Sequence, residues 1–127
     1  MIEFSVTMAN RPGELATLAR KMGTAGINIE ALAAFSTGSG ASLKLVVDND
    51  ATARVVLEKA GVEYEERRIV SATLHDHPGA LAQMTEALAA TGINIEAMYL
   101  LRASPGGLRF ALAVDDPDKA AEQLDGS

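Results

Sequence analysis

Cysteine is absent from the 127-residue sequence, so the chain can form no disulfide, thiolate zinc site or cysteine nucleophile. Basic residues are few, with 11 Lys and Arg against 17 Asp and Glu and a net charge of −6. Without a cluster of Lys and Arg, nucleic acid and anionic membranes are not expected as partners. The sequence also lacks apolar runs of about 18 residues and the basic-then-apolar pattern of a signal peptide. A soluble cytoplasmic protein is therefore expected.

What the sequence does contain is an internal repeat with an offset of 66 residues. Asn10-Arg11-Pro12-Gly13 aligns with Asp76-His77-Pro78-Gly79, and the hexapeptide from Gly26 to Ala31 recurs unchanged from Gly92 to Ala97. Ten of the 26 positions aligned between 10–35 and 76–101 are identical. A fixed offset indicates one structural unit used twice. We therefore predict two domains, residues 1–68 and residues 69–127, each too small to bury a secure core alone.

The spacing of apolar residues predicts the elements of each unit. Alternation over residues 2–8 and 70–74 is typical of a strand with one buried face. After each Pro-Gly the apolar residues take helical spacing, with Leu15, Leu18 and Met22 matched by Leu81, Met84 and Leu88. Second strands over Ile27–Phe35 and Ile93–Leu101 run into Gly/Ser-rich turns, which predict hairpins with the third strands.

The last elements of the two units differ. The third strands end at Asp48 and Asp115, and Asp50 and Asp116 are predicted to cap the second helices. A fourth strand is predicted over 62–66, with no counterpart in the second half. The fold class is therefore α+β, with two tandem ferredoxin-like βαββαβ units, antiparallel sheets and a second unit that lacks its last strand. The unpaired edge favours a homodimer or larger homo-oligomer.

The loop after the first strand of each unit is the candidate ligand site. It opens at a helix N-terminus, where unpaired N–H groups and the helix dipole favour a carboxylate. Gly13 and Gly79 allow close approach of the backbone to a ligand. Asn28 and Asn94 begin the second strands, and an amide can accept from an ammonium while donating to a carboxylate. These groups together suit a zwitterion.

Each of these features also has a structural interpretation. The glycines after each helix are typical helix punctuation, and Asn28 and Asn94 can instead satisfy the backbone of a turn. His75-Asp76-His77 could chelate a metal, but alternate loop residues seldom face one way and no further ligand is evident, so we predict a solvated loop and no metal or cofactor.

The two motifs, Asn10-Arg11-Pro12-Gly13 and Gly26-Ile27-Asn28-Ile29-Glu30-Ala31, resemble the ACT domain, a regulatory module that binds amino acids. The resemblance covers essentially the whole chain, once per half. It implies that the effector binds at the interface between two ACT units, through the first loop and the start of the second strand. Carried over by position with their neighbours, the candidate ligand-binding residues are Asn10, Arg11, Gly13, Asn28 and Ile29 in the first unit and Asp76, His77, Gly79, Asn94 and Ile95 in the second.

Three functions remain open on this sequence. The first is a non-catalytic regulatory protein that senses an amino acid. The second is a regulatory subunit that docks onto a separate amino-acid biosynthetic enzyme. The third is an acylphosphatase-like enzyme, because Arg11 with Asn28 imitates the catalytic pair of that family, although the expected Gly-rich phosphate loop is absent and no other catalytic set is visible.

Overall fold

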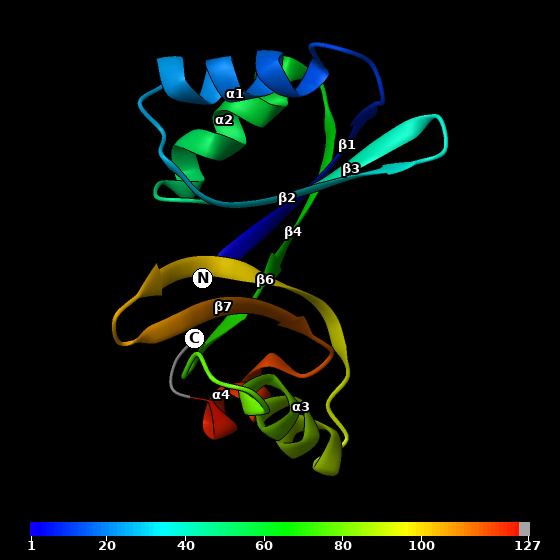
Figure 1. The fold of residues 1–127 in the computed structure, drawn as a ribbon. Coiled ribbons are helices and arrows are strands. Elements are labelled where there is room, and N and C mark those ends of the chain that lie inside the picture. The colour runs from blue at the N-terminus through cyan, green and yellow to red at the C-terminus, as the bar shows by residue number, and fades with distance from the viewer. Residues whose placement is uncertain (125–127) are drawn as a thin grey trace. The chain divides into compact units, whose positions relative to one another are not determined.

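The computed structural model describes residues 1–124, in which helices and strands follow one another in the order that the repeat predicts (Figure 1). In chain order they are β1 (Ile2–Ala9), α1 (Glu14–Thr24), β2 (Ile29–Thr37), β3 (Gly40–Val47), α2 (Asp50–Ala60), β4 (Glu63–Arg68), β5 (Val70–Leu74), α3 (Ala80–Ala90), β6 (Ile95–Ser104), β7 (Gly107–Val114) and α4 (Pro117–Gln123). This order confirms the α+β fold class. No helix among the described residues is long and apolar enough to cross a membrane.

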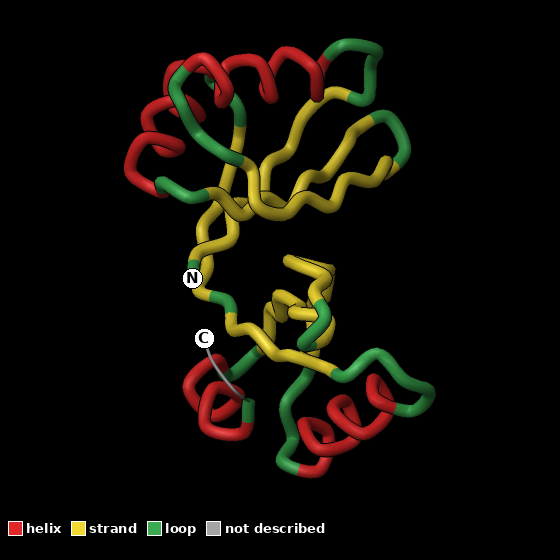
Figure 2. The backbone as a smooth tube through the Cα atoms, turned by 60° about the vertical axis from the view of Figure 1, so that its left-hand side comes forward, coloured by secondary structure: helices red, strands yellow, loops and turns green. Residues whose placement is uncertain are grey.

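The chain divides into two compact units, residues 2–67 and the residues from Arg68 on together with Met1. In the first unit the strand order is β2-β3-β1-β4. Strands β1 and β2 both pair antiparallel with β3, so that Leu43 lies between Val6 and Ala34. Helices α1 and α2 cover one face of this sheet (Figures 1 and 2), which is the ferredoxin-like arrangement.

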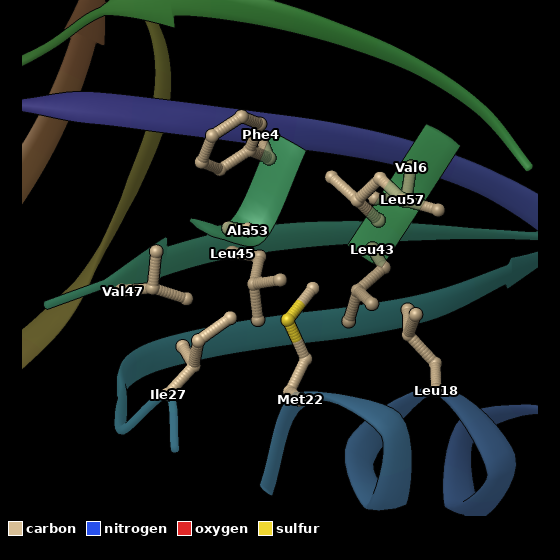
Figure 3. Packing of buried hydrophobic residues seen from close by; sticks show 10 residues of the cluster. All are labelled: Phe4, Val6, Leu18, Met22, Ile27, Leu43, Leu45, Val47, Ala53 and Leu57. Carbon is tan, nitrogen blue, oxygen red and sulfur yellow. The ribbon is translucent and has the colours of Figure 1, made fainter. Parts of the chain in front are cut away.

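The core of the first unit lies between this sheet and the two helices (Figure 3). The inward residues of the strands meet the apolar stripe of each helix, as the period-2 and helical patterns require. The buried residues are Phe4, Val6, Leu18, Met22, Ile27, Leu43, Leu45, Val47, Ala53 and Leu57.

The second unit has a three-stranded sheet in the order β5-β7-β6. Both outer strands pair antiparallel with β7, as Val70 with Leu112 and Met98 with Leu112 illustrate. Among the described residues of this unit, none forms a strand in the place that β4 takes in the first. Its core consists of Val70, Ala72, Met84, Leu88, Ile93, Leu112, Val114 and Ala120.

Two predicted boundaries are corrected by the structure. The second strands begin two residues late, at Ile29 and Ile95, because the preceding isoleucines close the helices: the N–H of Ile27 donates to Met22 O at 3.0 Å and that of Ile93 to Leu88 O at 3.1 Å. Asp50 does not cap α2. Asn49 does so instead, its side chain accepting from the N–H of Thr52, whereas Asp116 caps α4 as predicted.

Candidate functional site

Each Pro-Gly loop ends in a glycine that starts a helix in a left-handed conformation. Gly13 and Gly79 both have a φ of 88°. Residues other than glycine adopt this backbone angle only at a cost in free energy. A Cβ added at either position would meet no atom within 4 Å, so the backbone conformation alone favours glycine. No side chain caps α1 or α3. The N–H groups of Glu14 and Ala80 donate to Arg11 O and His77 O, both at 3.3 Å. The next two N–H groups of each helix are open to an external acceptor such as a carboxylate.

The two loops differ in charge. In the first unit the Arg11 guanidinium pairs with Glu14 in the first turn of α1, with Nε 3.0 Å from Oε1. In the second unit α3 has no acidic residue in its first turn. In the loop before α3 the rings of His75 and His77 are stacked, with 6.3 Å between their centroids. A competing carboxylate thus lies in the first helical turn of α1, as Glu14, whereas in the second unit it lies in the loop before α3, as Asp76.

The backbone of each candidate asparagine is fixed by an aspartate. The N–H of Asn28 donates to Asp48 Oδ1 at 3.0 Å, and the N–H of Asp48 donates to Asn28 O at 3.2 Å. Asn94 and Asp115 repeat this arrangement at 2.9 and 3.2 Å. The side chains of Asp48 and Asp115, and not those of the asparagines, therefore accept the backbone hydrogen bonds of these turns. Both asparagines are exposed. Sequence reasoning missed this role, although the two aspartates recur as the ends of equivalent strands.

We predict that Asp48→Ala lowers the free energy of unfolding by about 1 kcal/mol, because the Asn28 N–H loses its acceptor. Asp48→Asn is the matched control, since it keeps an oxygen at the same place and should recover most of the loss. Urea unfolding measures both variants. Equal losses in the two variants would mean that this hydrogen bond does not hold the turn.

Within one unit the structure places the loop and the asparagine at opposite ends of the sheet. The N–H of Asn10 donates to Ser39 O at 3.2 Å, beside the β2–β3 hairpin, whereas Asn28 lies beside Asp48, where β2 begins and β3 ends. The nine residues of β2 between them span about 30 Å at roughly 3.3 Å per residue. One amino acid cannot contact Asn10 and Asn28 of the same unit.

The same separation holds in the second unit, where Leu74, just before the Asp76 loop, pairs with Leu108 near the hairpin and Asn94 lies beside Asp115. It also weighs against the acylphosphatase-like hypothesis. That mechanism requires Arg11 and Asn28 at one acyl phosphate, and within the unit they lie a strand length apart.

The candidate residues differ in their surroundings. Asn10 and Arg11 line a cavity of about 220 Å³ at the first loop, and His77 lines one of about 400 Å³ at the second. Ile29 and Ile95 are half-buried and pack against the two cores, so their side chains face away from an external ligand. Five further candidates are exposed and line neither cavity: Gly13, Asn28, Asp76, Gly79 and Asn94.

Comparison with known proteins agrees with this fold. The ACT domain family matches residues 68–124. A crystal structure of a protein from Bacteroides thetaiotaomicron is 23% identical, with a TM-score of 0.89, over 99% of this chain and 90% of that one.

Regulatory subunits of aspartate kinase share the fold as well. The ligand-free subunit from Thermus thermophilus is 24% identical with a TM-score of 0.71, over 96% of this chain and 85% of that one. The subunit from Thermus flavus is 22% identical with a TM-score of 0.66, over 95% and 85%. A search of curated proteins finds no match. Residues 68–124 thus match the ACT domain family, and the whole chain shares the fold of these solved structures.

Proposed function

We propose that the chain is a non-catalytic, cytoplasmic regulatory protein that binds a free amino acid through its ACT units. One observation carries this proposal: two features recur in both units. The first is an uncapped helix start opened by a left-handed glycine. The second is an exposed asparagine whose backbone is fixed by an aspartate. The helix start offers N–H donors to the carboxylate of a ligand, and the asparagine offers its amide oxygen to the ammonium.

The separation within each unit dictates how such a ligand binds. Because loop and asparagine of one unit lie about 30 Å apart, the ligand takes its loop from one unit and its asparagine from another. We propose that the second unit belongs to another copy of the chain, so that the site lies at an interface in a homodimer or larger oligomer. Asn10, Arg11 and Gly13, or His77 and Gly79, would face the carboxylate. Asn94 or Asn28 would face the ammonium, which the Asp76 carboxylate would also attract.

A thermal-shift experiment with each of the twenty amino acids tests this function. We expect one amino acid or a small related group to raise the unfolding midpoint, because a ligand that binds only the folded state stabilises it by mass action. At a concentration one hundred times its Kd, the gain is about 2.7 kcal/mol. If none of the twenty raises the midpoint at millimolar concentration, the amino-acid proposal fails.

The second candidate function, a subunit that regulates a separate biosynthetic enzyme, is favoured by the surface of α1 and α2. A groove of about 610 Å³ there has an apolar floor that includes Val55, which is 50% exposed. Arg20, Lys21 and Lys59 surround it, and none of the three forms an ion pair with a described residue. Unpaired cations around an apolar floor suit an acidic protein surface. The related aspartate kinase subunits are named as regulatory.

For this candidate we expect the chain to co-purify in stoichiometric amount with the catalytic chain of such an enzyme. The variant Arg20→Glu/Lys21→Glu/Lys59→Glu should lose that chain, because like charges across an interface repel. Lys119→Glu, an exposed lysine of the second unit, is the control and should retain it. If the chain instead purifies as a homo-oligomer that binds an amino acid, with no co-purifying enzyme, the free-standing sensor is supported and the subunit function is rejected.

A further inference from the structure

A polar cavity of about 570 Å³ lies on the face of the first sheet that is opposite α1 and α2. The residues of β1 and β3 that line it alternate with core residues such as Val6, so their side chains point away from the helices. Strand pairing sets Ser5 opposite Lys44 and Thr7 opposite Ser42. Three hydroxyls and one ammonium are therefore cross-strand neighbours on this face.

The ammonium of Lys44 has no carboxylate partner. Lys44 is half-buried, its Nζ donates to Ser5 Oγ at 2.8 Å, and it forms no ion pair with any residue from 1 to 124. Arg67 also lines the cavity, but its Nε lies 2.7 Å from Oε1 of the buried Glu3, so that charge is balanced within the sheet. A partly desolvated cation without a counter-charge favours an anionic group of a ligand.

Strand β4 adds two carboxylates to the same cavity. Tyr64 packs against the core, so Glu63 and Glu65 on either side of it point to the opposite face, where both line the cavity. Both are exposed, and neither forms an ion pair within the described part of the chain. The cavity thus offers one unpaired cation and two unpaired anions.

The cation and the anions lie on two sides of β1, because β1 stands between β3 and β4. With neighbouring strands about 4.8 Å apart, the backbones of Lys44 and of the two glutamates are roughly 10 Å apart. A ligand that reaches both sides therefore needs charged groups at both of its ends. The volume of about 570 Å³ is within the range of about 300 to 1,000 Å³ that is typical of small-molecule sites.

The second unit has no copy of this cavity. Ser71 repeats Ser5, but the residue opposite it is the buried Ala111, where Ser5 faces Lys44. No strand within residues 68–124 takes the place of β4, so the two carboxylates are missing as well. The cavity therefore occurs once per chain, whereas the loops occur twice.

We propose that this face of the first unit binds a cationic amino acid such as lysine. Its carboxylate faces Lys44 and the three hydroxyls, and its side-chain cation faces Glu63 and Glu65. The ligand carries one anion and two cations, which is the reverse of the unpaired charges in the cavity. Its side-chain cation also stands at the far end from its carboxylate, as the separation across β1 requires. The site goes beyond the proposed function, because it is contained in one unit and separate from the loops.

Calorimetric titration with lysine, norleucine and cadaverine tests this proposal. Norleucine has the lysine skeleton without the side-chain ammonium, and cadaverine has it without the carboxylate. We expect both to bind the native chain about fivefold or more weakly than lysine, because each lacks one charged end. In Asn28→Ala/Asn94→Ala, which weakens the loop sites, one lysine per chain should still bind.

Two variants remove the charges of the cavity. In Lys44→Met and in Glu63→Gln/Glu65→Gln the affinity for lysine should fall about fivefold or more, because each variant loses a charge partner of the ligand. Both glutamates are exposed, so the second variant should fold as the native chain does. Circular dichroism checks this.

The control variants make the same kinds of charge change on exposed residues of the second unit, as Lys119→Met and Glu86→Gln/Glu122→Gln. Both should bind lysine as the native chain does. A loss of lysine affinity in these controls equal to the loss in the first-unit variants would overturn the proposal, because net charge and not the cavity would then set the affinity.

Three further results would overturn the proposal. The first is a lysine affinity that is unchanged in both first-unit variants. The second is binding of norleucine or cadaverine as tight as that of lysine, and the third is no binding of lysine, ornithine or arginine. If lysine binding is lost in Asn28→Ala/Asn94→Ala but kept in Lys44→Met, lysine binds at the loops, so the proposed function stands and only this site fails.

Discussion

Replacing Gly107 by alanine is expected to destabilise the second unit by about 3 kcal/mol. Gly107 begins β7 with a φ of 132°. The backbone of an alanine would be strained at this angle. A Cβ at this position would lie 2.5 Å from the carbonyl oxygen of Leu74. Backbone strain and overpacking each cost roughly 1 to 3 kcal/mol. Relief of the clash requires the end of β5 to move, immediately before the loop that contains Asp76 and His77.

Gly106→Ala is the control, one residue away in the same hairpin. Its Cβ would meet only Ser104 Oγ, at 3.7 Å, so we expect a change of less than about 0.5 kcal/mol. Urea unfolding followed by circular dichroism measures both variants. Equal stabilities for the two variants would show that the close approach of Gly107 to β5 does not constrain this hairpin.

The fold followed from sequence because its signals are local and occur twice. Alternation in β1 and β5, Pro-Gly before α1 and α3, and glycine after each helix each predict one element, and the repeat tests each prediction against its copy. The predicted starts of β2 and β6 lie two residues too early because Ile27 and Ile93 are apolar and β-branched, as strand residues often are. Their N–H groups instead bond to the preceding helices, a tertiary detail that periodicity does not contain.

The site was less accessible to sequence reasoning, because which residues meet depends on topology. Pro12-Gly13 and Asn28 are 15 residues apart, yet α1 carries the chain back along the sheet, so the two lie at opposite ends of a strand. The hydrogen bond from Asn28 to Asp48 joins residues 20 apart.

The second large effect, on ligand affinity, is expected from replacing Asn28 and Asn94. Replacing Asn28 and Asn94 together by alanine should weaken amino-acid binding about tenfold or more, because each lost charge-assisted hydrogen bond is worth roughly 1.5 to 3 kcal/mol. Stability should change little, since Asp48 and Asp115 bond to the backbone of these residues and both side chains are exposed. The proposed roles of Asn28 and Asn94 thus concern binding and not folding.

Asn49→Ala is the matched control for this pair. Asn49 is also exposed, but its side chain caps α2 by accepting from the N–H of Thr52. Its loss should lower the free energy of unfolding by about 1 kcal/mol and leave ligand affinity unchanged. The control therefore separates an effect on stability from an effect on the ligand.

Calorimetric titration of the Asn28→Ala/Asn94→Ala variant, with the amino acid that gives the largest thermal shift, tests the central claim most directly. The account predicts an affinity reduced about tenfold or more, with an unfolding midpoint close to that of the native chain in the absence of ligand. Unchanged affinity and stoichiometry in this double variant would contradict it, because the two asparagines would then be structural and the ligand would bind elsewhere.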